Sequence, residues 1–177
     1  MSARRIRRLA AERKIPTQAL AAGMTVSLGP GIAVDVLHPP AGLLPGVAPE
    51  SNDNSAVLRV TMGSISMLLT GDIEEAGLPV LLHNAAGLRS NVLKVPHHGS
   101  RLGAAGEALL AAVRPDIAVL SVGRIHHLPA RETLDQLARY DVPTLSTRDA
   151  GAIQLRTDGT HLQVRTFKGA RRWETVR

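Results

Sequence analysis

Residues 92–100 read Val92-Leu93-Lys94-Val95-Pro96-His97-His98-Gly99-Ser100, and the order of these residue types sets the architecture expected for the rest of the chain. A short apolar run closed by proline and glycine is typical of a buried strand that ends in a turn. The two histidines therefore stand where a strand leaves the core. Histidines without a function are less expected at such a position than in an open surface loop.

Helical and extended patterns alternate on both sides of this segment. The spacing predicts helices over 3–13, 74–84, 103–113 and 130–140. It predicts strands over 24–28, 32–37, 57–61, 64–69, 92–95, 117–120, 144–146, 152–156 and 162–166. Strands that alternate with helices in this way indicate a sheet with helices packed over it.

Length and composition narrow the chemistry. The 177 residues suit one domain, and a hydrophobic content of 44% is enough to bury a core. Because the chain has no cysteine, any metal must be held by its histidines and acidic residues. The apolar runs fall far short of the roughly 20 residues that a membrane-spanning helix needs. No signal-peptide pattern follows the basic start, so a cytoplasmic chain is the expectation.

The positive charge of +6 is concentrated at the two ends of the chain. Residues 1–14 carry a net +5 and residues 168–177 a net +3, which leaves the body near −2. Such ends either contact nucleic-acid phosphates or are solvated helix faces, and the sequence leaves both readings open. An aromatic content of 2% argues against a base-stacking platform, so a nucleic acid is expected to be held by its backbone.

Three apolar runs end in polar groups. These groups are Thr70-Gly71-Asp72, His97-His98 with its Gly-Ser turn, and Ser121-Val122-Gly123 with His126 and His127 just beyond. If the three strands are parallel, the groups meet at one edge of the sheet, where open α/β sheets bind ligands. Taken singly, Asp72 also fits a plain helix start, and His126 and His127 also fit an exposed loop.

Five motifs in this order and spacing resemble the C-terminal metallo-β-lactamase-like domain of the ComEC family of competence proteins. They are Asn52-Asp53-Asn54-Ser55, Leu68-Leu69-Thr70-Gly71-Asp72, residues 93–100, Ser121-Val122-Gly123 and the turn over 147–151. The resemblance spans about residues 24–166. It implies an α+β fold, a four-layer αββα sandwich with two zinc ions at the edge of the sheets, manganese being the alternative metal. The implied activity is metal-dependent cleavage of DNA phosphodiesters during DNA uptake.

The resemblance also implies roles for single residues. Asp72 would bridge the metals, with His97 as a further ligand and His98 as its possible substitute. Asn52, Asn54 and Ser55 would orient substrate or metal-bound water, although a plain polar turn is an equal reading of these three. Ser100, Ser121 and His126 are expected near the substrate. His127 would contact phosphate or protonate the leaving group, although Leu128 separates it from the proline that follows this histidine directly in the family.

The first ligand cluster of the superfamily, His-x-His-x-Asp-His, does not occur in the sequence. The chain therefore resembles the C-terminal portion of a larger domain, with a basic helical segment over 1–23, a partial metallo-β-lactamase-like domain over 24–167 and a basic tail over 168–177. Its expected partners are DNA and either the missing half of the domain or a membrane channel domain, since the family is membrane-associated. Asp72 and His97 supply two of about four zinc ligands.

Two classes of function remain open. The chain is either part of a metal-dependent DNA hydrolase or a non-catalytic remnant that binds a partner through the face left open. Another hydrolase of the superfamily, such as a lactonase or β-lactamase, is a weaker alternative, because the sequence context of His97 and His98 speaks against it. In each case an uncovered sheet face predicts low solubility or self-association.

Overall fold

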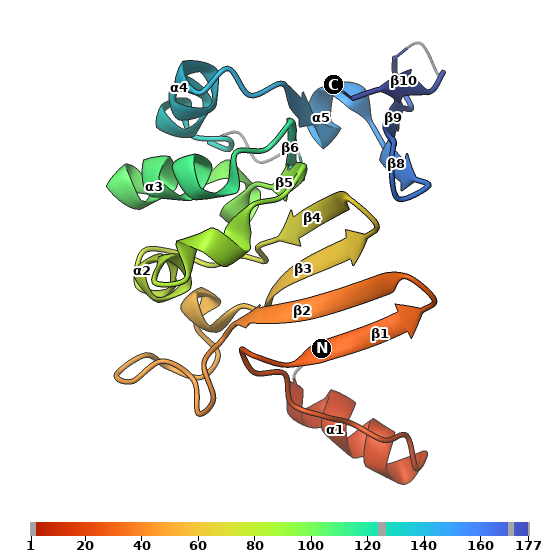
Figure 1. The fold of residues 1–177 in the computed structure, drawn as a ribbon. Coiled ribbons are helices and arrows are strands. Elements are labelled where there is room, and N and C mark those ends of the chain that lie inside the picture. The colour runs from red at the N-terminus through yellow and green to blue at the C-terminus, as the bar shows by residue number, and fades with distance from the viewer. Residues whose placement is uncertain (1–2, 124–126, 170–171, 177) are drawn as a thin grey trace.

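A computed structural model describes residues 3–123, 127–169 and 172–176, and its elements follow one another in a simple order (Figure 1). The helices of the described residues are α1 (Ala3–Glu12), α2 (Gly77–Leu82), α3 (Gly103–Val113), α4 (Arg131–Arg139) and α5 (Thr147–Ala150). The strands are β1 (Thr25–Gly29), β2 (Ile32–His38), β3 (Val57–Met62), β4 (Ile65–Leu69), β5 (Val92–Lys94), β6 (Ile117–Leu120), β7 (Thr144–Ser146), β8 (Ile153–Thr157), β9 (Leu162–Thr166) and β10 (Glu174–Thr175). Short 3₁₀ turns cover Asn52–Asn54, Ala85–Leu88 and Pro96–Gly99.

The first seven strands form one mixed sheet in chain order. Strands β1 to β4 pair antiparallel, and β4 to β7 pair parallel. The change of direction follows the connections, because short loops join antiparallel neighbours whereas parallel neighbours need a crossover. The connections that leave β4, β5 and β6 contain α2, α3 and α4, respectively.

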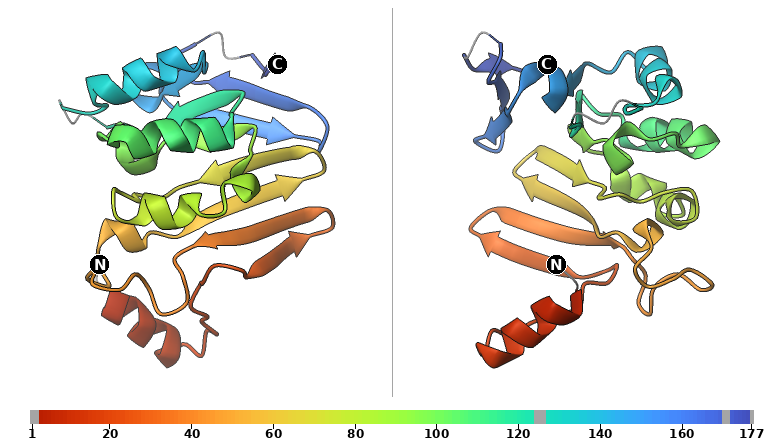
Figure 2. Two further views of the ribbon diagram at one scale, coloured as in Figure 1. Left: turned by 60° about the vertical axis from the view of Figure 1, so that its left-hand side comes forward. Right: turned by 180° about the vertical axis from the view of Figure 1, so that it is seen from behind.

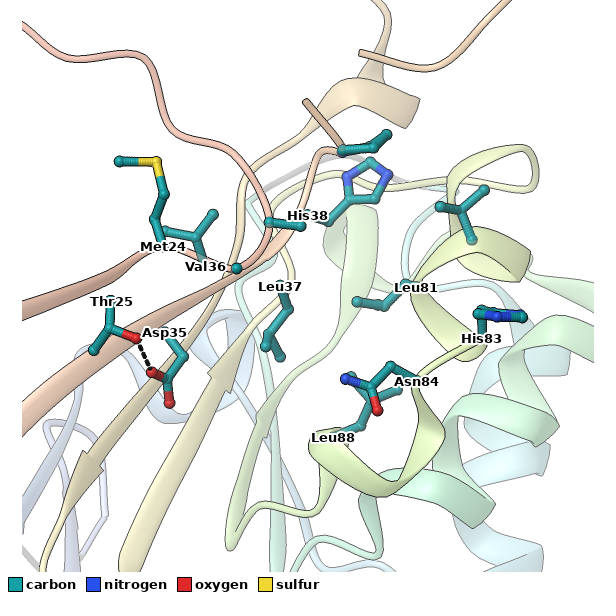
Figure 3. A pocket seen from close by; sticks show the side chains of 14 residues that line it. Met24, Thr25, Asp35, Val36, Leu37, His38, Leu81, His83, Asn84 and Leu88 are labelled. Atoms are coloured by element: carbon teal, nitrogen blue, oxygen red, sulfur yellow. Dashed lines mark hydrogen bonds between the residues drawn. The ribbon is translucent and has the colours of Figure 1, made fainter. Parts of the chain in front are cut away.

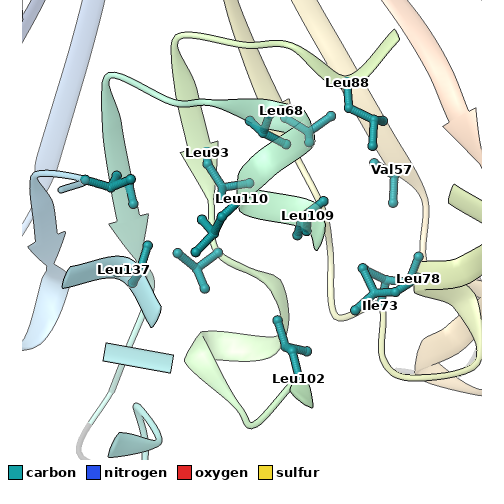
Figure 4. Close-up of a cluster of buried hydrophobic side chains, with 14 of the residues drawn as sticks. Val57, Leu68, Ile73, Leu78, Leu88, Leu93, Leu102, Leu109, Leu110 and Leu137 are labelled. Atoms are coloured by element: carbon teal, nitrogen blue, oxygen red, sulfur yellow. The ribbon is translucent and has the colours of Figure 1, made fainter. Parts of the chain in front are cut away.

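The crossover helices α2, α3 and α4 all lie on one face of the sheet (Figures 1 and 2). Figure 4 shows the core between these helices and the sheet, where leucines of both layers interlock. Leu68 of β4 and Leu93 of β5 are fully buried there against helix residues such as Leu109 of α3. This core fixes the ends of β4, β5 and β6 relative to one another, and those ends carry the polar groups singled out in the sequence.

A small antiparallel sheet, β8–β9–β10, lies on the opposite face of the main sheet (Figure 2). Leu162 of β9 packs there with Val92 of β5 and Ile117 of β6. The described part of the molecule therefore has three layers, which are helices, a seven-stranded sheet and a three-stranded sheet. A fourth, helical layer outside the small sheet is not among the described residues.

The antiparallel part of the main sheet is less covered, most of all at its terminal strand β1. Val26 and Leu28 of β1 are 38% and 65% exposed. α1 lies beyond this edge and buries little more than Ala10. Within the described residues, no helix is long and apolar enough to cross a bilayer.

The predicted elements agree with the observed ones, with three differences. The turn expected over 147–151 contains the short helix α5. The helix expected over 74–84 begins only at Gly77, because the Asp53 carboxylate accepts hydrogen bonds from the N–H groups of Glu74 and Gly77 at 3.2 and 2.8 Å and shapes a turn there. Strand β10 was not predicted, because Glu174-Thr175 carries no apolar alternation and forms a strand only by pairing with β9. The segment over 168–177, expected as a basic tail, thus contributes to the small sheet.

Candidate active site

The polar groups after β4, β5 and β6 meet at the carboxyl edge of the parallel strands. Leu69, Lys94 and Val119 are register partners across these three strands, so the residues that follow each strand share one edge. The His97 N–H donates to the Gly71 carbonyl at 3.3 Å, which joins the first two groups. His98 Nδ1 lies 2.6 Å from the Ser121 carbonyl oxygen, which joins the second and third.

Asp72 is placed by a tight turn. Gly71 adopts a φ of +57°, and a Cβ at that position would lie 2.9 Å from the Ser55 Cβ. This close approach lets Ser55 Oγ accept a hydrogen bond from the Asp72 N–H at 3.1 Å. Glycine is thus required at position 71 both for its backbone conformation and for space.

The turn that carries the two histidines is strained. His97 and His98 both have positive φ angles, 42° and 56°, which residues with a Cβ rarely adopt. Gly99, also at positive φ, presses against Leu120 and Pro129, where a Cβ would come within 2.6 and 2.7 Å of their side-chain carbons. Two consecutive strained histidines at a sheet edge are of the kind that persist at functional sites.

His98 faces Asp72. Its Nε2 lies 3.8 Å from Asp72 Oδ1, and both side chains are 39% exposed. Because the Ser121 carbonyl can only accept, His98 Nδ1 must carry the hydrogen of their 2.6 Å contact. In the neutral ring Nε2 then holds a lone pair that points to the side of Asp72. A backbone carbonyl that fixes one ring nitrogen and frees the other is the usual support of a metal-binding histidine.

His97 has a different neighbour. Its Nδ1 lies against the Glu74 carboxylate, but this buried nitrogen has no hydrogen bond of acceptable geometry. The two histidine rings are 6.1 Å apart and tilted by 60°. Among the described residues, the imidazole that pairs with Asp72 is therefore that of His98, and His97 is turned to Glu74.

Lys94 adds a positive charge beneath the turn. Its Nζ donates to the Gly71 carbonyl at 2.6 Å and lies 3.5 Å from Asp72 Oδ1. Burial lowers the pKa of Lys94, while the neighbouring Asp72 carboxylate partly opposes that shift. The ammonium group is 2.6 Å from a carbonyl of the turn and thereby ties β5 to the loop after β4.

The turn over 52–55 lies beside the site, and its side chains form hydrogen bonds to different parts of the molecule. Asn52 Nδ2 donates to Glu74 at 3.2 Å. Asn54 is used within its own loop, since its amide bonds the Leu44 N–H at 2.9 Å and the Ala48 carbonyl at 3.0 Å. Ser55 supports Asp72 directly, as described above. Asn52 and Ser55 thus reach the site through Glu74 and Asp72, whereas Asn54 shapes the loop.

The remaining predicted residues lie around the edge. Ser100 follows the histidine turn, and its carbonyl accepts from Thr133 Oγ1 at 2.7 Å. Ser121 is exposed and reaches the site through its carbonyl. His127 is exposed, and His126 lies outside the described residues. No direct contact joins Asp72 to Ser100 or Ser121.

Three residues shape this edge but were not predicted as site residues from the sequence. Glu74 follows Asp72 by two positions and contacts His97. Lys94 is the one charged residue in an otherwise apolar strand, which is a signal that could have drawn attention to it. Thr147 Oγ1 binds the Val122 N–H and carbonyl at 2.8 and 2.9 Å and so attaches the end of β6 to α5.

These side chains do not complete a metal site by themselves. No group of three or more histidine, aspartate or glutamate side chains among the described residues is arranged to hold a metal ion. Two donors on one tetrahedral zinc ion lie about 3.3 Å apart, so the 3.8 Å between Asp72 and His98 requires only a small adjustment. Asp72 and His98 are thus one carboxylate–imidazole pair, whereas a zinc site needs about four ligands.

A separate cavity of about 300 Å³ lies between β2 and α2 (Figure 3). Thr25 donates there to Asp35 at 2.8 Å, and the buried His38 bonds the Ser55 carbonyl through Nδ1 at 2.9 Å, whereas His38 Nε2 has no hydrogen-bond partner among the described residues. Asp35 and His38 do not pair with each other. The candidate active site is therefore the edge around Asp72 and His98.

Comparison with known proteins gives a consistent group of relatives. No protein-family profile matches the chain. The chain is 37% identical over 108 residues to ComE operon protein 3 of Bacillus subtilis (strain 168) and 32% identical over 115 residues to Recombination protein 2 of Haemophilus influenzae. It is 34% identical over 108 residues to competence protein ComA of Neisseria gonorrhoeae. These matches cover 59–64% of the chain but only 14–16% of each relative.

Proposed function

From the premise that the chain is homologous to competence proteins of the ComEC family, we propose that it forms part of a metal-dependent hydrolase that cleaves DNA phosphodiesters during DNA uptake. The fold proposed for the complete unit is the αββα metallo-β-lactamase-like sandwich. The three layers described here, with helices outside one of two facing sheets, support that assignment. Zinc, or manganese in its place, is the proposed metal.

The observation that supports this proposal most is the pairing of Asp72 with His98. A carboxylate and a neutral imidazole are suitable donors for zinc, and the Ser121 carbonyl already fixes the ring so that Nε2 is free to bind. When bound, the metal supplies an activated water and charge stabilisation for phosphodiester hydrolysis. Ser55 holds the backbone of Asp72, and Lys94 places a positive charge 3.5 Å from its carboxylate.

The remaining ligands come from outside these 177 residues in this proposal. The sequence has no His-x-His-x-Asp-His cluster, and the matched part is a small fraction of each relative. A segment that carries such a cluster would complete the metal shell and cover the open face of the main sheet. DNA and, in the complete assembly, a membrane channel domain are the further proposed partners.

Complementation tests the proposal. The chain is mixed with a separately produced segment of a relative that carries the His-x-His-x-Asp-His cluster, and cleavage of fluorescently labelled single-stranded DNA is followed with zinc or manganese. We expect metal-dependent cleavage that is lost in Asp72→Ala. The matched control is Asp35→Ala, because Asp35 lies in the separate cavity and accepts a hydrogen bond from Thr25. Undiminished cleavage by Asp72→Ala would remove Asp72 from the reaction.

A non-catalytic, partner-binding role is the second candidate. The two expected metal ligands already contact charged residues of the same chain, which favours this role. Lys94 lies beside Asp72, and Glu74 lies against His97. A site that is neutralised internally needs no metal to be stable. Complementation that gives a stable complex but neither metal binding nor cleavage would support this second role.

A further inference from the structure

The outer face of the small sheet carries an unusual combination of side chains. Strand alternation turns Leu155, Leu162 and Val164 toward the main sheet, and it turns Arg156 and Arg165 away from it. Trp173, which precedes β10, lies against both guanidinium groups, with their central carbons 4.0 and 4.8 Å from the ring centroid. We infer that this face binds single-stranded nucleic acid, with the arginines on phosphates and the indole on a base.

The two arginines are fixed but not neutralised. Arg156 Nε donates to Gln163 Oε1 at 2.8 Å, and Arg165 Nε donates to Gln154 Oε1 at 3.0 Å. Neither arginine has an ion-pair partner among the described residues, because the glutamines that hold them are uncharged. A guanidinium group that is oriented by stacking and by a neutral acceptor keeps its full charge and its remaining donors for a phosphate.

The low aromatic content led us to expect no base-stacking platform, but two of the three aromatic residues lie on this one face. The chain has one tryptophan, one tyrosine and one phenylalanine, and Trp173 and Phe167 both belong to this surface. Phe167 is 60% exposed and lines a hollow of about 270 Å³ together with Gln154 and Arg165. Trp173 is partly exposed. Accessible rings beside arginines are the usual means by which single strands are bound, because every base has a face that can stack.

Charges of both signs surround the two arginines. Lys168 is exposed beside Phe167, and its ammonium group donates to the Arg148 carbonyl at 3.0 Å. Asp158 lines a second hollow of about 320 Å³ with Arg156, and its carboxylate is turned to the β8–β9 loop, where it accepts from the N–H groups of His161 and Thr160. Glu174 pairs with Arg172 at 3.6 Å in an exposed contact, which contributes little.

The outer face of the small sheet lies near the candidate active site but is a separate surface. Arg148 of α5 donates through Nε to the Gly123 carbonyl at 3.3 Å, at the end of β6. Its own carbonyl accepts from Lys168. The small sheet thus borders the edge that carries His98 and Ser121. Binding at this face nevertheless stands apart from the hydrolytic function proposed above, because it involves neither Asp72 nor a metal.

The single tryptophan makes a direct test available. A dT oligonucleotide is titrated into the full 177-residue chain with a chelator present, and both tryptophan fluorescence and anisotropy of the labelled oligonucleotide are recorded. We expect quenching of Trp173 that follows the anisotropy. Arg156→Gln/Arg165→Gln should weaken binding and lower the salt slope by about 1.4, since each lost phosphate contact on a single strand contributes about 0.7. Trp173→Ala should weaken anisotropy-detected binding at least about fivefold.

The matched control is Arg131→Gln/Arg139→Gln on α4, which removes the same charge from exposed ion pairs elsewhere. Its affinity for the oligonucleotide should equal that of the parent chain. Binding that leaves the fluorescence unchanged, or that falls equally in both double variants, would place the nucleic acid elsewhere and overturn the inference. Equal affinity for duplex and single strand, or no binding at all, would also overturn it. Failure of DNA cleavage in the complementation experiment would leave this result untouched.

Discussion

The imidazole of His98 faces the carboxylate of Asp72, with 3.8 Å between Nε2 and Oδ1. These residues follow two different parallel strands, β4 and β5, and meet because both strands end at the same edge of the sheet. The contact depends on strained backbone at His98 and on a glycine turn before Asp72. Perturbing the support of this edge should therefore change the site without touching either side chain.

Gly99→Ala should be strongly destabilising. Gly99 has a φ of +83°, and the new methyl group would lie 2.6 Å from Leu120 Cδ2 and 2.7 Å from Pro129 Cβ. Leu120 is buried in the core and has little room to move. We expect a loss of about 1–3 kcal/mol from overpacking, in addition to about 1–2 kcal/mol from the backbone conformation. Urea unfolding measures the change.

Gly103→Ala separates these two effects. Gly103 also has a positive φ, +55°, but no atom lies within 4 Å of its added Cβ. It should lose only the backbone contribution. Equal losses of unfolding free energy in both variants would contradict the packing explanation for Gly99.

The uncovered part of the main sheet should promote self-association. Leu28 and Val26 of β1 are 65% and 38% exposed, and apolar area of this kind gains about 25 cal/mol for each Å² that is buried. Sedimentation velocity of the isolated chain should show species larger than a monomer. Val26→Thr/Leu28→Thr should raise the monomer fraction, whereas Leu134→Thr on α4 should not. A sharp monomer for the parent chain would contradict this prediction.

The Asp158 turn should give a defined pH dependence. Hydrogen bonds from the backbone N–H groups of His161 and Thr160 hold the pKa of Asp158 well below its usual range. Because the folded pKa is depressed, the stabilisation is complete above the unfolded value of about 3.9 and is lost as pH falls toward the folded value. Asp158→Asn should therefore be less stable than the parent at pH 7, with a difference that shrinks in acid.

Carboxyl-carbon NMR provides the matching check on Asp158. Its resonance should remain that of an ionised carboxylate at pH values below about 3.9, at which an aspartate in an unfolded reference peptide is already largely protonated. Titration of Asp158 together with the aspartate of the reference peptide would show that the turn does not stabilise the charge.

The architecture could be predicted because apolar periodicity is a local property. Gly103–Val113 and Ile117–Leu120 were predicted with the observed bounds, since glycine or proline lies at or near the ends of each. Strand β10 could not be predicted in the same way. Glu174 and Thr175 become a strand only through their pairing with Val164 and Gln163 of β9. This pairing cannot be recognised from the hydrophobic pattern of two residues.

The residue types at the candidate site could be predicted from the sequence, but which side chains contact each other could not. Parallel neighbours bring Asp72 and the two histidines to one edge, as the order of strands and helices indicates. Which imidazole faces Asp72 depends on the backbone angles of His97 and His98, and adjacent residues with positive φ have no sequence signature beyond the glycine that follows. Lys94 and Glu74 were missed because each acts through a tertiary contact.

The proposed role of the Asp72–His98 pair can be tested by following the histidine ring nitrogens by ¹⁵N NMR while zinc is added to the complemented protein. We predict that His98 Nε2 shifts to a metal-bound position, that His98 Nδ1 keeps its proton, and that the exposed His161 does not change at the same zinc concentration. Cleavage activity that saturates with zinc while the His98 resonances stay unchanged would contradict the account.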